Sequence, residues 1–456
     1  MKILETSKGA NPNYLAKVVV LKNLRQHPNA NRLQLATVDG YTIITGLNAK
    51  EGDLQVFFPI ECVINHRYLS YSNSFDTPEL NADKTTKSFF GSKGRVRAIR
   101  LRTVMSEGYI VPIDNIIAFA KDVLKVKLKV EDLKEGVEFD TIGGEKFVWK
   151  YEVPIKLSGG IPGNKQQKLL RKYESKLVER QFSFHDDTRH LKREMYKVTP
   201  DSLISISNKI HGANFCVSNV LVKRKLSIVE KVAKFLGAKV QETEYGLIYA
   251  SRKAVKNGNL NESPNAGYYG VDLWKIVADQ VYPFLKRGIT AYGEVYGYTP
   301  TGGMIQKNYD YGCKEGQLDF VVFRLTYTNI CGDVFEFTWP QVLAYCKVNG
   351  LKTPETYYYG KARDLFPNLD INEHWKEEFI SKMCETYLEK DCHLCKSSVV
   401  PAEGVILVLE DTLQRNAFKL KSNRFIERET KMLDKGEVGV EDQDDSTPDD
   451  EILHTT

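Results

Sequence analysis

Six short apolar runs separated by turn signals follow Leu15, and this pattern constrains the fold more than any other feature of the sequence. The runs cover residues 16–24, 32–38, 41–46, 54–60, 96–102 and 108–113. The turn signals between them are Asp39-Gly40, Gly46-Leu47-Asn48 and Glu51-Gly52-Asp53. Short apolar runs bounded by Gly, Asn and Asp are typical of β-strands joined by tight turns. We therefore expect an all-β domain in this part of the chain.

The number and even spacing of these runs favour a five-stranded barrel of the OB type, whose open face commonly binds nucleic acid. Residues 27–35, with the sequence HPNANRLQL, resemble the first hairpin of tRNA-binding OB modules. A barrel that only braces its neighbour is the alternative. We expect an OB-like, nucleic-acid-binding N-terminal domain over residues 1–148.

A second domain is expected because 456 residues exceed what one hydrophobic core usually serves. Glycine pairs at residues 143–144 and 159–160, followed by a basic segment, predict a linker over residues 149–194. An amphipathic connector helix is predicted within the linker by the spacing of Leu169, Leu170, Tyr173 and Leu177.

The rest of the chain divides into an α+β domain and a charged tail. Strand-like runs alternate over residues 195–433 with helical runs at 225–240, 271–287 and 372–390. Residues 434–456 carry a net charge of −8, so the overall charge of +5 leaves +13 on residues 1–433. A basic body favours a polyanionic partner, although an ordinary solvated surface could carry the same charge. We expect the acidic tail to be disordered.

Composition also bounds the compartment. The aliphatic runs, such as residues 404–409, cover about six residues, whereas a helix needs about twenty to span a bilayer, so we expect no membrane partner. The N-terminal residues lack the apolar stretch of a secretory signal. The eight cysteines are mostly isolated, which suits a reducing compartment. These features predict a cytoplasmic protein.

The main candidate for chemistry is Lys209, which leaves an apolar run and is followed three residues later by Gly212. A glycine at this spacing allows the backbone to approach a nucleotide closely. Lysine is a poor nucleophile at its ordinary pKa of about 10.4, so an enzyme must lower that pKa by burial, nearby cations or a metal ion. Further cationic residues are therefore expected downstream.

Such residues follow in an order that resembles one family. The segment KIHGANF at residues 209–215 is similar to nucleotidyl-transfer motif I of double-strand RNA ligases from phages and trypanosome editing complexes. Segments similar to the family's later motifs are YASR at 249–252, GEVYG at 293–297, IQKNYDYG at 305–312, DFVVFRL at 319–325, EGVI at 403–406 and FKLKS at 418–422.

The resemblance extends beyond this core. An OB-like domain ahead of it, and the linker text FSFHDDTRHL at residues 182–191, resemble ATP-dependent RNA ligases of the Deinococcus and Naegleria type. The implied fold is multidomain, with an all-β OB-like barrel followed by an α+β nucleotidyltransferase (adenylation) domain.

The resemblance implies a role for each motif residue. Lys209 would attack the α-phosphorus of ATP and become lysyl-AMP. Lys419 and Lys421 would contact the α-phosphate, and their charges would help to hold Lys209 unprotonated. Glu403 would bind the catalytic Mg²⁺ or Mn²⁺ directly or through water, as hard carboxylates do, and Glu294 would bind the AMP ribose or a metal-bound water.

The other implied contacts surround the base and the sugar. Phe323 would stack on adenine, with Phe320 as the weaker candidate. Arg252 and Asn214 would contact phosphate or the ribose of the acceptor strand. His211 stands where DNA ligases carry aspartate, and we expect it to engage phosphate rather than metal. Histidine at this position favours RNA over DNA sealing.

The sequence departs from the family pattern in three places. Asn208 stands where relatives often have glutamate, and Arg324 stands where they often have aspartate. Residues 298–304 form a longer insert than in the phage enzymes. The contacts to the adenine edge and the loop over the nucleotide are therefore left open.

One cysteine pair lies outside the resemblance to the phage enzymes. Cys392 and Cys395 have the CxxC spacing of a zinc knuckle, with Cys384, Cys313 or Cys331 as possible further ligands. The sequence contains no second CxxC. A structural Zn²⁺ ion and a pair of reduced thiols are both compatible with this pattern.

The combined hypothesis is an ATP-dependent RNA ligase that seals 3′-hydroxyl/5′-phosphate breaks through lysyl-AMP and an adenylylated 5′-phosphate. We expect a monomer that acts on nicked duplex RNA or a broken tRNA-like RNA. A DNA ligase or a GTP-dependent capping enzyme shares the core chemistry, but these usually carry the OB domain after the last motif, and only about 35 residues follow Lys421. A non-catalytic RNA-binding protein is the second alternative.

Overall fold

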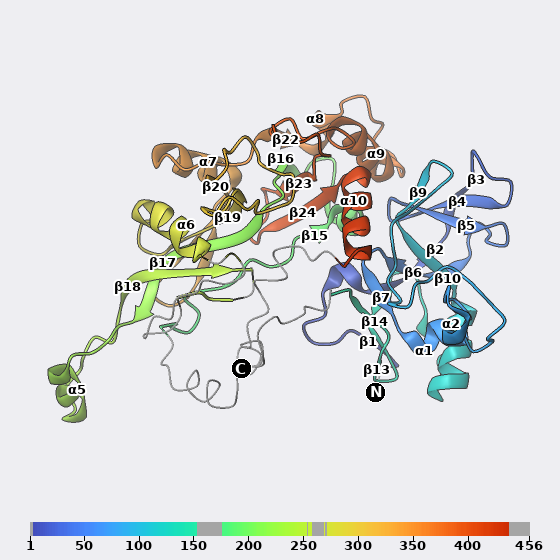
Figure 1. Cartoon of the computed structure of the whole chain (residues 1–456), viewed down its shortest axis with the longest axis horizontal. Coiled ribbons are helices and arrows are strands. Elements are labelled where there is room, and N and C mark those ends of the chain that lie inside the picture. Colours follow the sequence, from blue (N-terminus) through green and yellow to red (C-terminus); the bar gives the residue numbers. More distant parts are fainter. Residues whose placement is uncertain (1–2, 153–175, 253, 258–268, 270, 437–456) are drawn as a thin grey trace.

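The computed structural model describes residues 3–152, 176–252, 254–257, 269 and 271–436. The N-terminal domain and the larger α+β body lie side by side, and helix α10 (Asn423–Asp434) runs between them (Figure 1). Most of the predicted connector helix and nearly all of the acidic tail fall outside the described residues. At the described end of the connector, Leu177 forms an antiparallel bridge with Val222 instead of a helical turn, because an exposed edge of the sheet takes up its backbone groups.

Every apolar run predicted in the N-terminal domain contains a strand. These strands are β2 (Ala16–Val20), β3 (Lys22–Gln26), β4 (Leu33–Val38), β5 (Tyr41–Gly46), β6 (Leu54–Pro59), β8 (Ile99–Leu101) and β10 (Gly108–Pro112). The turn between β4 and β5 shows why the sequence folds this way: Asp39 and Gly40 both have positive φ, which suits a tight hairpin that pairs Val38 with Tyr41.

The strands of this domain form two sheets that close against each other. One sheet has the order β10-β6-β2-β11, with β11 at Glu138–Phe139, and the other has the order β3-β4-β5. The Glu107 amide donates to the Thr42 carbonyl and so joins β5 to the start of β10. Apolar side chains of both sheets fill the interior, including Val18, Val56 and Phe57, which are fully buried. The arrangement is the expected small barrel.

Shorter elements of the N-terminal domain gave no clear sequence pattern. They are β1 (Leu4–Glu5), the 3₁₀ helix Pro12–Tyr14, β7 (Cys62–Ile64), α1 (His66–Tyr71), β9 (Val104–Ser106), α2 (Ile113–Phe119), β12 (Thr141–Ile142), β13 (Glu145–Lys146) and β14 (Val148–Lys150). Strands of two or three residues are too short for an alternating pattern, so their positions depend on tertiary contacts.

The larger body contains two five-stranded sheets. The first has the order β15-β24-β23-β16-β22 and the second the order β18-β17-β19-β20-β21. Their bounds are β15 (Arg189–His190), β16 (Leu203–Lys209), β17 (Ala213–Lys223), β18 (Thr243–Ser251), β19 (Ile289–Gly297), β20 (Leu318–Thr328), β21 (Val334–Glu336), β22 (Thr356–Lys361), β23 (Gly404–Leu409) and β24 (Asn416–Lys421).

Helices cover both sheets and leave a space between them. Apolar residues of α6 (Leu273–Val281) and α7 (Trp339–Val348) pack on the second sheet. Residues of α4 (Leu191–Glu194), α8 (Ala362–Leu365) and α9 (Trp375–Tyr387) pack on the first. Helix α5 (Ile228–Phe235) lies at the end of the β17–β18 hairpin, away from both sheets (Figure 1). The three predicted helical runs thus contain α5, α6 and α9. Within the described ranges, no helix has the length and apolar character that a bilayer crossing requires.

Helix α10 attaches the N-terminal domain to the first sheet. Arg95 makes two hydrogen bonds of 2.8 Å to the carboxylate of Glu61 and also pairs with Asp434 at the end of α10. The Thr430 hydroxyl donates to the same Glu61 carboxylate at 3.2 Å. Burial raises the pKa of Glu61 to about 7, although Arg95 opposes this. The guanidinium of Arg95 therefore stabilises a buried carboxylate at the domain interface.

Arg95→Ala should lower the free energy of unfolding by about 3 kcal/mol, because it leaves the buried Glu61 carboxylate without its cation. Urea unfolding of the purified protein measures the change. Arg97→Ala is the matched control: Arg97 is partly exposed and lies 3.8 Å from Asp434, so its loss should cost less than about 0.5 kcal/mol. Equal destabilisation by the two variants would contradict the assignment.

Candidate active site

A cavity of about 280 Å³ lies between the two five-stranded sheets, with α10 and the N-terminal domain on one side. Strand register places its central residues. Lys209 at the end of β16 pairs with Gly404 at the start of β23, and Gly404 pairs in turn with Lys421 at the end of β24. Because neighbouring strands lie about 4.8 Å apart, this row brings Lys209, Lys421 and the residue before Gly404 together. That residue is Glu403.

Glu403 is the anion at the centre of this row. Its Oε1 lies 2.9 Å from the Lys209 Nζ and 3.7 Å from the Lys421 Nζ. Lys421 also contacts Glu429 of α10 at 3.0 Å. Burial lowers the pKa of Lys209, but the carboxylates of Glu403 and Glu294 raise it. The carboxylates outweigh burial, so the pKa of Lys209 lies above its ordinary value.

The prediction that Lys419 and Lys421 help to hold Lys209 unprotonated stays a prediction for the site with its nucleotide bound. Lys421 does lower the pKa of Lys209, but the two carboxylates outweigh it. The sequence motifs identify each cation and each anion, but which of them lies nearest to the amine depends on the folded geometry.

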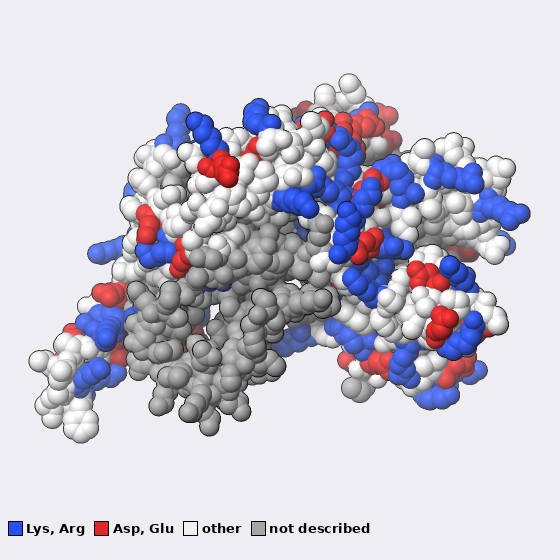
Figure 2. Space-filling view, in the orientation of Figure 1, with Lys and Arg blue, Asp and Glu red and all other residues white. Residues whose placement is uncertain are grey.

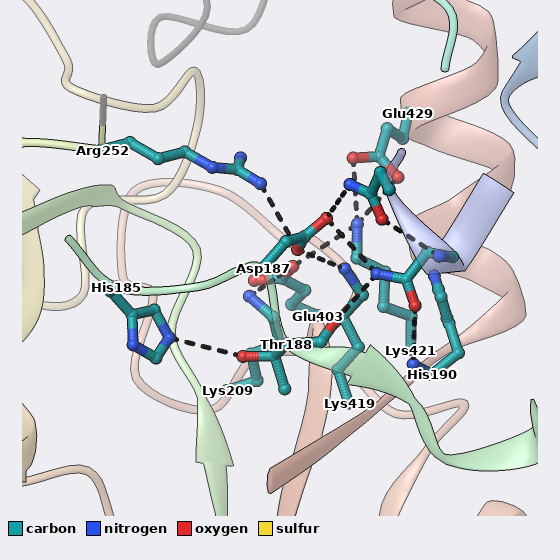
Figure 3. Close-up of polar contacts among 12 residues, drawn as sticks. His185, Asp187, Thr188, His190, Lys209, Arg252, Glu403, Lys419, Lys421 and Glu429 are labelled. Carbon is teal, nitrogen blue, oxygen red and sulfur yellow. Dashed lines mark hydrogen bonds and ion pairs between the residues drawn. The ribbon is translucent and has the colours of Figure 1, made fainter. Parts of the chain in front are cut away.

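Lys419 has a different partner from Lys421. Its Nζ lies 2.9 Å from Oδ1 of Asp187, and the same oxygen lies 3.3 Å from Nη2 of Arg252 (Figure 3). Burial lowers the pKa of Lys419 to about 8, with Asp187 opposing the shift. The structure thus brings together the predicted residues Lys209, Arg252, Glu403, Lys419 and Lys421.

Two carboxylates at the cavity could hold a divalent cation. Glu403 Oε2 is buried and has no hydrogen-bond partner among the described residues. Glu294 lines the same cavity, and its Oε1 accepts from the Gly212 amide at 3.1 Å. No group of three or more His, Cys, Asp or Glu residues in the described ranges forms a complete metal cage. One or two carboxylates completed by water and phosphate oxygens suit Mg²⁺ or Mn²⁺, so this donor set fits such an ion.

His211 lies in an aromatic setting beside Glu403. Its ring is edge-on to Tyr309 and to Phe425 of α10, with centroids 4.9 Å away in each case. The His211 amide donates to the Tyr311 hydroxyl at 2.7 Å. Its Nδ1 lies 3.9 Å from Oε2 of Glu403. The structure therefore places His211 at the carboxylate that could hold a metal, as well as at the cavity that could hold phosphate.

The far end of the cavity is suited to an aromatic base. Phe323 on β20 lines it, and the imidazole of His185 is tilted against the Phe323 ring with centroids 5.0 Å apart. Ile406 and Val408 on β23 also line the cavity. Phe320 instead packs into the core beneath the second sheet. Phe323 is therefore the aromatic residue of this strand that a base could contact.

Two other residues near the base end have partners that limit their roles. Asn208 lines the cavity, and its backbone amide donates to the Glu355 carbonyl at 2.8 Å. Arg324 pairs with Glu336 and packs over the Tyr292 ring at 4.5 Å, which directs its charge into the protein. Asn214 lines the cavity from β17, opposite Glu294 in the strand register.

Some residues at the cavity were missed by the sequence-based prediction. Asp187 and His185 come from the segment before β15, Arg415 from the position just before β24 and Glu429 from α10. Arg415 lies outside the strand, so the alternation that sets Lys419 and Lys421 on one face of β24 gave no signal for it. Asp187 stood in the quoted linker text, but no local pattern indicated which cation it would meet.

Comparison with known proteins agrees with this architecture. A family model described as an OB-fold domain matches residues 15–113. No curated protein matches the chain in sequence. A variant of the Naegleria gruberi RNA ligase with ATP and Mn has a TM-score of 0.55 at 16% identity, covering 91% of this chain and 98% of that one. The same ligase with pyrophosphate gives a TM-score of 0.55 at 16% identity, with coverages of 92% and 99%.

The chain has the fold of this RNA ligase. The expected fold class, an OB-like barrel followed by an α+β nucleotidyltransferase domain, is thereby confirmed. In this chain the cavity lies between the two sheets that the strand orders define.

The CxxC pair lies next to the aromatic setting of His211. The Cys395 thiol donates to the Cys392 sulfur at 3.1 Å, and this hydrogen bond lowers the pKa of Cys392 to about 7. Neither sulfur belongs to a group of three or more metal-ligating side chains in the described part of the chain. Zinc therefore finds no support, because Cys313, Cys331 and Cys384 do not complete a site around the pair.

Gly212→Ala should lower the free energy of unfolding by about 1–3 kcal/mol, because an added Cβ would lie 2.2 Å from the Val295 carbonyl oxygen and 2.8 Å from Cγ of Glu294. Thermal unfolding monitored by circular dichroism measures the change. Gly91→Ala is the matched control, since no atom lies within 4 Å of a Cβ built there. A melting temperature for Gly212→Ala equal to that of the control would contradict the close approach.

Proposed function

We propose that the protein is an ATP-dependent RNA ligase, a covalent nucleotidyltransferase with Lys209 as its nucleophile. The supporting observation is the strand row that places Lys209 and Lys421 around Glu403, with Lys419 in the same cavity. The fold is that of an RNA ligase whose solved forms include complexes with ATP and Mn, with AMP and Mn, and with pyrophosphate.

In the first step, the Lys209 Nζ attacks the α-phosphorus of ATP. A P–N bond forms, the bond from the α-phosphorus to the bridging oxygen breaks, pyrophosphate leaves, and the amine loses a proton. The positive side chains of Lys419 and Lys421 offset the charge that develops on the α-phosphate. Glu403 and Glu294 would hold a Mg²⁺ or Mn²⁺ ion, whose charge offsets that of the phosphates and of the two carboxylates.

The nucleotide orientation follows from the two ends of the cavity. Phe323 would stack on adenine while the lysines hold the phosphates. Gly212 allows the backbone to lie close to Val295 and Glu294. Asn214 and Arg252, which line the cavity, would supply polar contacts to ribose or phosphate. The cavity would thus hold the α-phosphorus within reach of Lys209.

The second and third steps join RNA ends. AMP passes from Lys209 to an RNA 5′-phosphate, and a neighbouring 3′-hydroxyl then attacks that phosphate and displaces AMP. Figure 2 shows Lys and Arg side chains on the visible face along α10 and the adjoining N-terminal domain, with acidic side chains among them. This surface suits a phosphate backbone. We assign residues 1–148 to RNA binding and the body from β15 to residue 433 to catalysis, so the linker predicted over 149–194 ends before β15, whose strand belongs to the first sheet. The protein would be a cytoplasmic monomer acting on nicked duplex or tRNA-like RNA.

The alternatives differ in nucleotide or in chemistry. A capping enzyme would take its nucleotide from GTP. A DNA ligase would seal all-DNA nicks as fast as nicks with a 3′ ribonucleotide. A non-catalytic binding protein would form no covalent adduct with either nucleotide. The segment after Lys421 begins with α10, which packs against the N-terminal domain. An OB domain that precedes the catalytic core favours the RNA ligase.

Incubation with α-labelled ATP and Mg²⁺ or Mn²⁺ should attach label to the protein, because Lys209 would retain the α-phosphate as lysyl-AMP. Lys209→Ala should take no label, and α-labelled GTP should give none with the wild-type protein. Denaturing electrophoresis followed by peptide mapping identifies the labelled residue. Label from GTP would favour a capping enzyme, and no label from either nucleotide would favour a binding protein.

Nicked duplexes that differ only in the sugar at the 3′ end test the RNA preference. A 3′-terminal ribonucleotide should be sealed at least tenfold faster than deoxyribose, since the 2′-hydroxyl is the group by which a protein distinguishes RNA from DNA at one position. Rates come from single-turnover sealing by preadenylylated protein. Equal rates on all-DNA nicks would contradict the preference.

A further inference from the structure

Asp187 lies where two separate groups of donors meet. Its Oδ1 faces Lys419 at 2.9 Å and Arg252 at 3.3 Å, both in the cavity. Its Oδ2 accepts from the side-chain amides of Asn11 at 2.8 Å and Asn13 at 3.3 Å, both in the N-terminal domain. Figure 3 shows this carboxylate between the Arg252 guanidinium and the Lys419 ammonium. One carboxylate therefore joins the cavity cations to the other domain.

Chain connectivity explains why Asp187 reaches this position. The parallel pairing of β15 with β24 sets His190 opposite Lys419, so Asp187, three residues earlier, lies near the same lysine. On the other side, Asn13 accepts from the His190 amide at 3.0 Å and donates to the Thr188 carbonyl at 3.2 Å. The N-terminal domain thus contacts the chain at Asp187 and at the residues that follow it.

The carboxylate is ionised in this setting. Burial raises the pKa of Asp187, but Lys419, Arg252 and Asn11 lower it well below its ordinary value. An ammonium, a guanidinium and two amide donors are also the groups that bind phosphate oxygens. The carboxylate of Asp187 thus occupies a position that would also suit a phosphate of the substrate.

We infer that Asp187 is a positioning residue that occupies a phosphate position between Lys419 and Arg252, and that substrate phosphate displaces it and loosens its contacts with Asn11 and Asn13. This inference rests on the proposed function. The two anions compete because Lys419 and Arg252 cannot face both at the same distance. Nucleotide binding would then weaken the hydrogen bonds that Asn11 and Asn13 make to Asp187. Because such coupling is reciprocal, these hydrogen bonds would in turn weaken nucleotide binding.

Two substitutions test this coupling from its two sides. Asp187→Asn removes the competing charge and should lower the KM for ATP in the labelling reaction at least about fivefold. Asn11→Ser removes one amide donor to Asp187 but retains an oxygen that can cap the 3₁₀ helix, where Asn11 accepts from the Asn13 amide. It should also lower the KM, because the carboxylate is held less firmly. The labelling rate at saturating ATP should stay near the wild-type value for Asn11→Ser, because Asn11 lies outside the cavity lining.

The double variant Asn11→Ser/Asp187→Asn shows whether Asn11 acts through the Asp187 carboxylate. Asn11→Ser should have no further effect on KM in the Asp187→Asn background, since the Asn11 amide acts through the carboxylate. Arg100→Ala is the matched control: it breaks a contact between the N-terminal domain and Glu427 of α10 without touching Asp187. Its KM should equal that of the wild type.

Hydrogen exchange supplies a second readout that does not depend on catalysis. ATP added to the Lys209→Ala variant should speed exchange of the His190 amide, which donates to Asn13. The same addition should have no such effect when Asp187→Asn is also present.

The failure of each idea gives a distinct result. A labelled wild-type protein whose KM is unchanged by Asn11→Ser, or changed equally in both Asp187 backgrounds, would overturn the coupling and leave the ligase proposal standing. A KM for Arg100→Ala that falls as far as that for Asn11→Ser would also overturn it. A wild-type protein that takes no label from ATP would overturn the ligase proposal and the inference together.

Discussion

The pairing of three strand ends is the constraint on which the rest of the site depends. Lys209, Gly404 and Lys421 stand opposite one another on β16, β23 and β24, so the backbone hydrogen bonds of one sheet fix the relative positions of the proposed nucleophile and of a lysine proposed to bind phosphate. A Cβ at Gly404 would lie 2.1 Å from the Leu420 carbonyl oxygen, which is why glycine follows Glu403. A shift of one residue in this register would turn Lys421 to the opposite face of the sheet.

The charges of the site are balanced in pairs, and this balance shapes what the cavity can bind. Lys209 lies beside Glu403, Lys421 beside Glu429, and Lys419 beside Asp187. Each buried ammonium thus has its own carboxylate, as burial of charge demands. A triphosphate that enters must either displace a carboxylate from its lysine or enter together with a cation. Displacement of Asp187 from Lys419 would be the first route, and a divalent ion held by Glu403 and Glu294 would be the second.

The sequence predicts the parts of this site well and their connections poorly. Residues such as Lys209, Glu403 and Lys421 belong to short segments in which neighbours along the chain carry the signal. The pairing of Asp187 with Asn11 joins residues 176 positions apart, and no local pattern indicates such a contact. The same holds for Lys209 and Glu403: the motifs name the two residues separately, but the distance of 2.9 Å between their charged atoms depends on the fold.

The N-terminal barrel shows the same division at the level of the fold. Its longer strands follow from the apolar runs and from the Asp39-Gly40 turn signal, both readable in the sequence. Its attachment to the larger body does not, because Arg95 and Glu61 are single charged residues whose burial arises only when α10 packs beside them. Two of the contacts that join the domains differ in kind. The one through Arg95 involves no cavity cation, whereas the one through Asp187 shares its carboxylate with Lys419 and Arg252. Of these two, the contact through Asp187 is the one that the inferred competition with phosphate would weaken, while the ion pairs of Arg95, and those that join Lys192 to Glu107 and Arg193 to Glu138, would keep the domain attached.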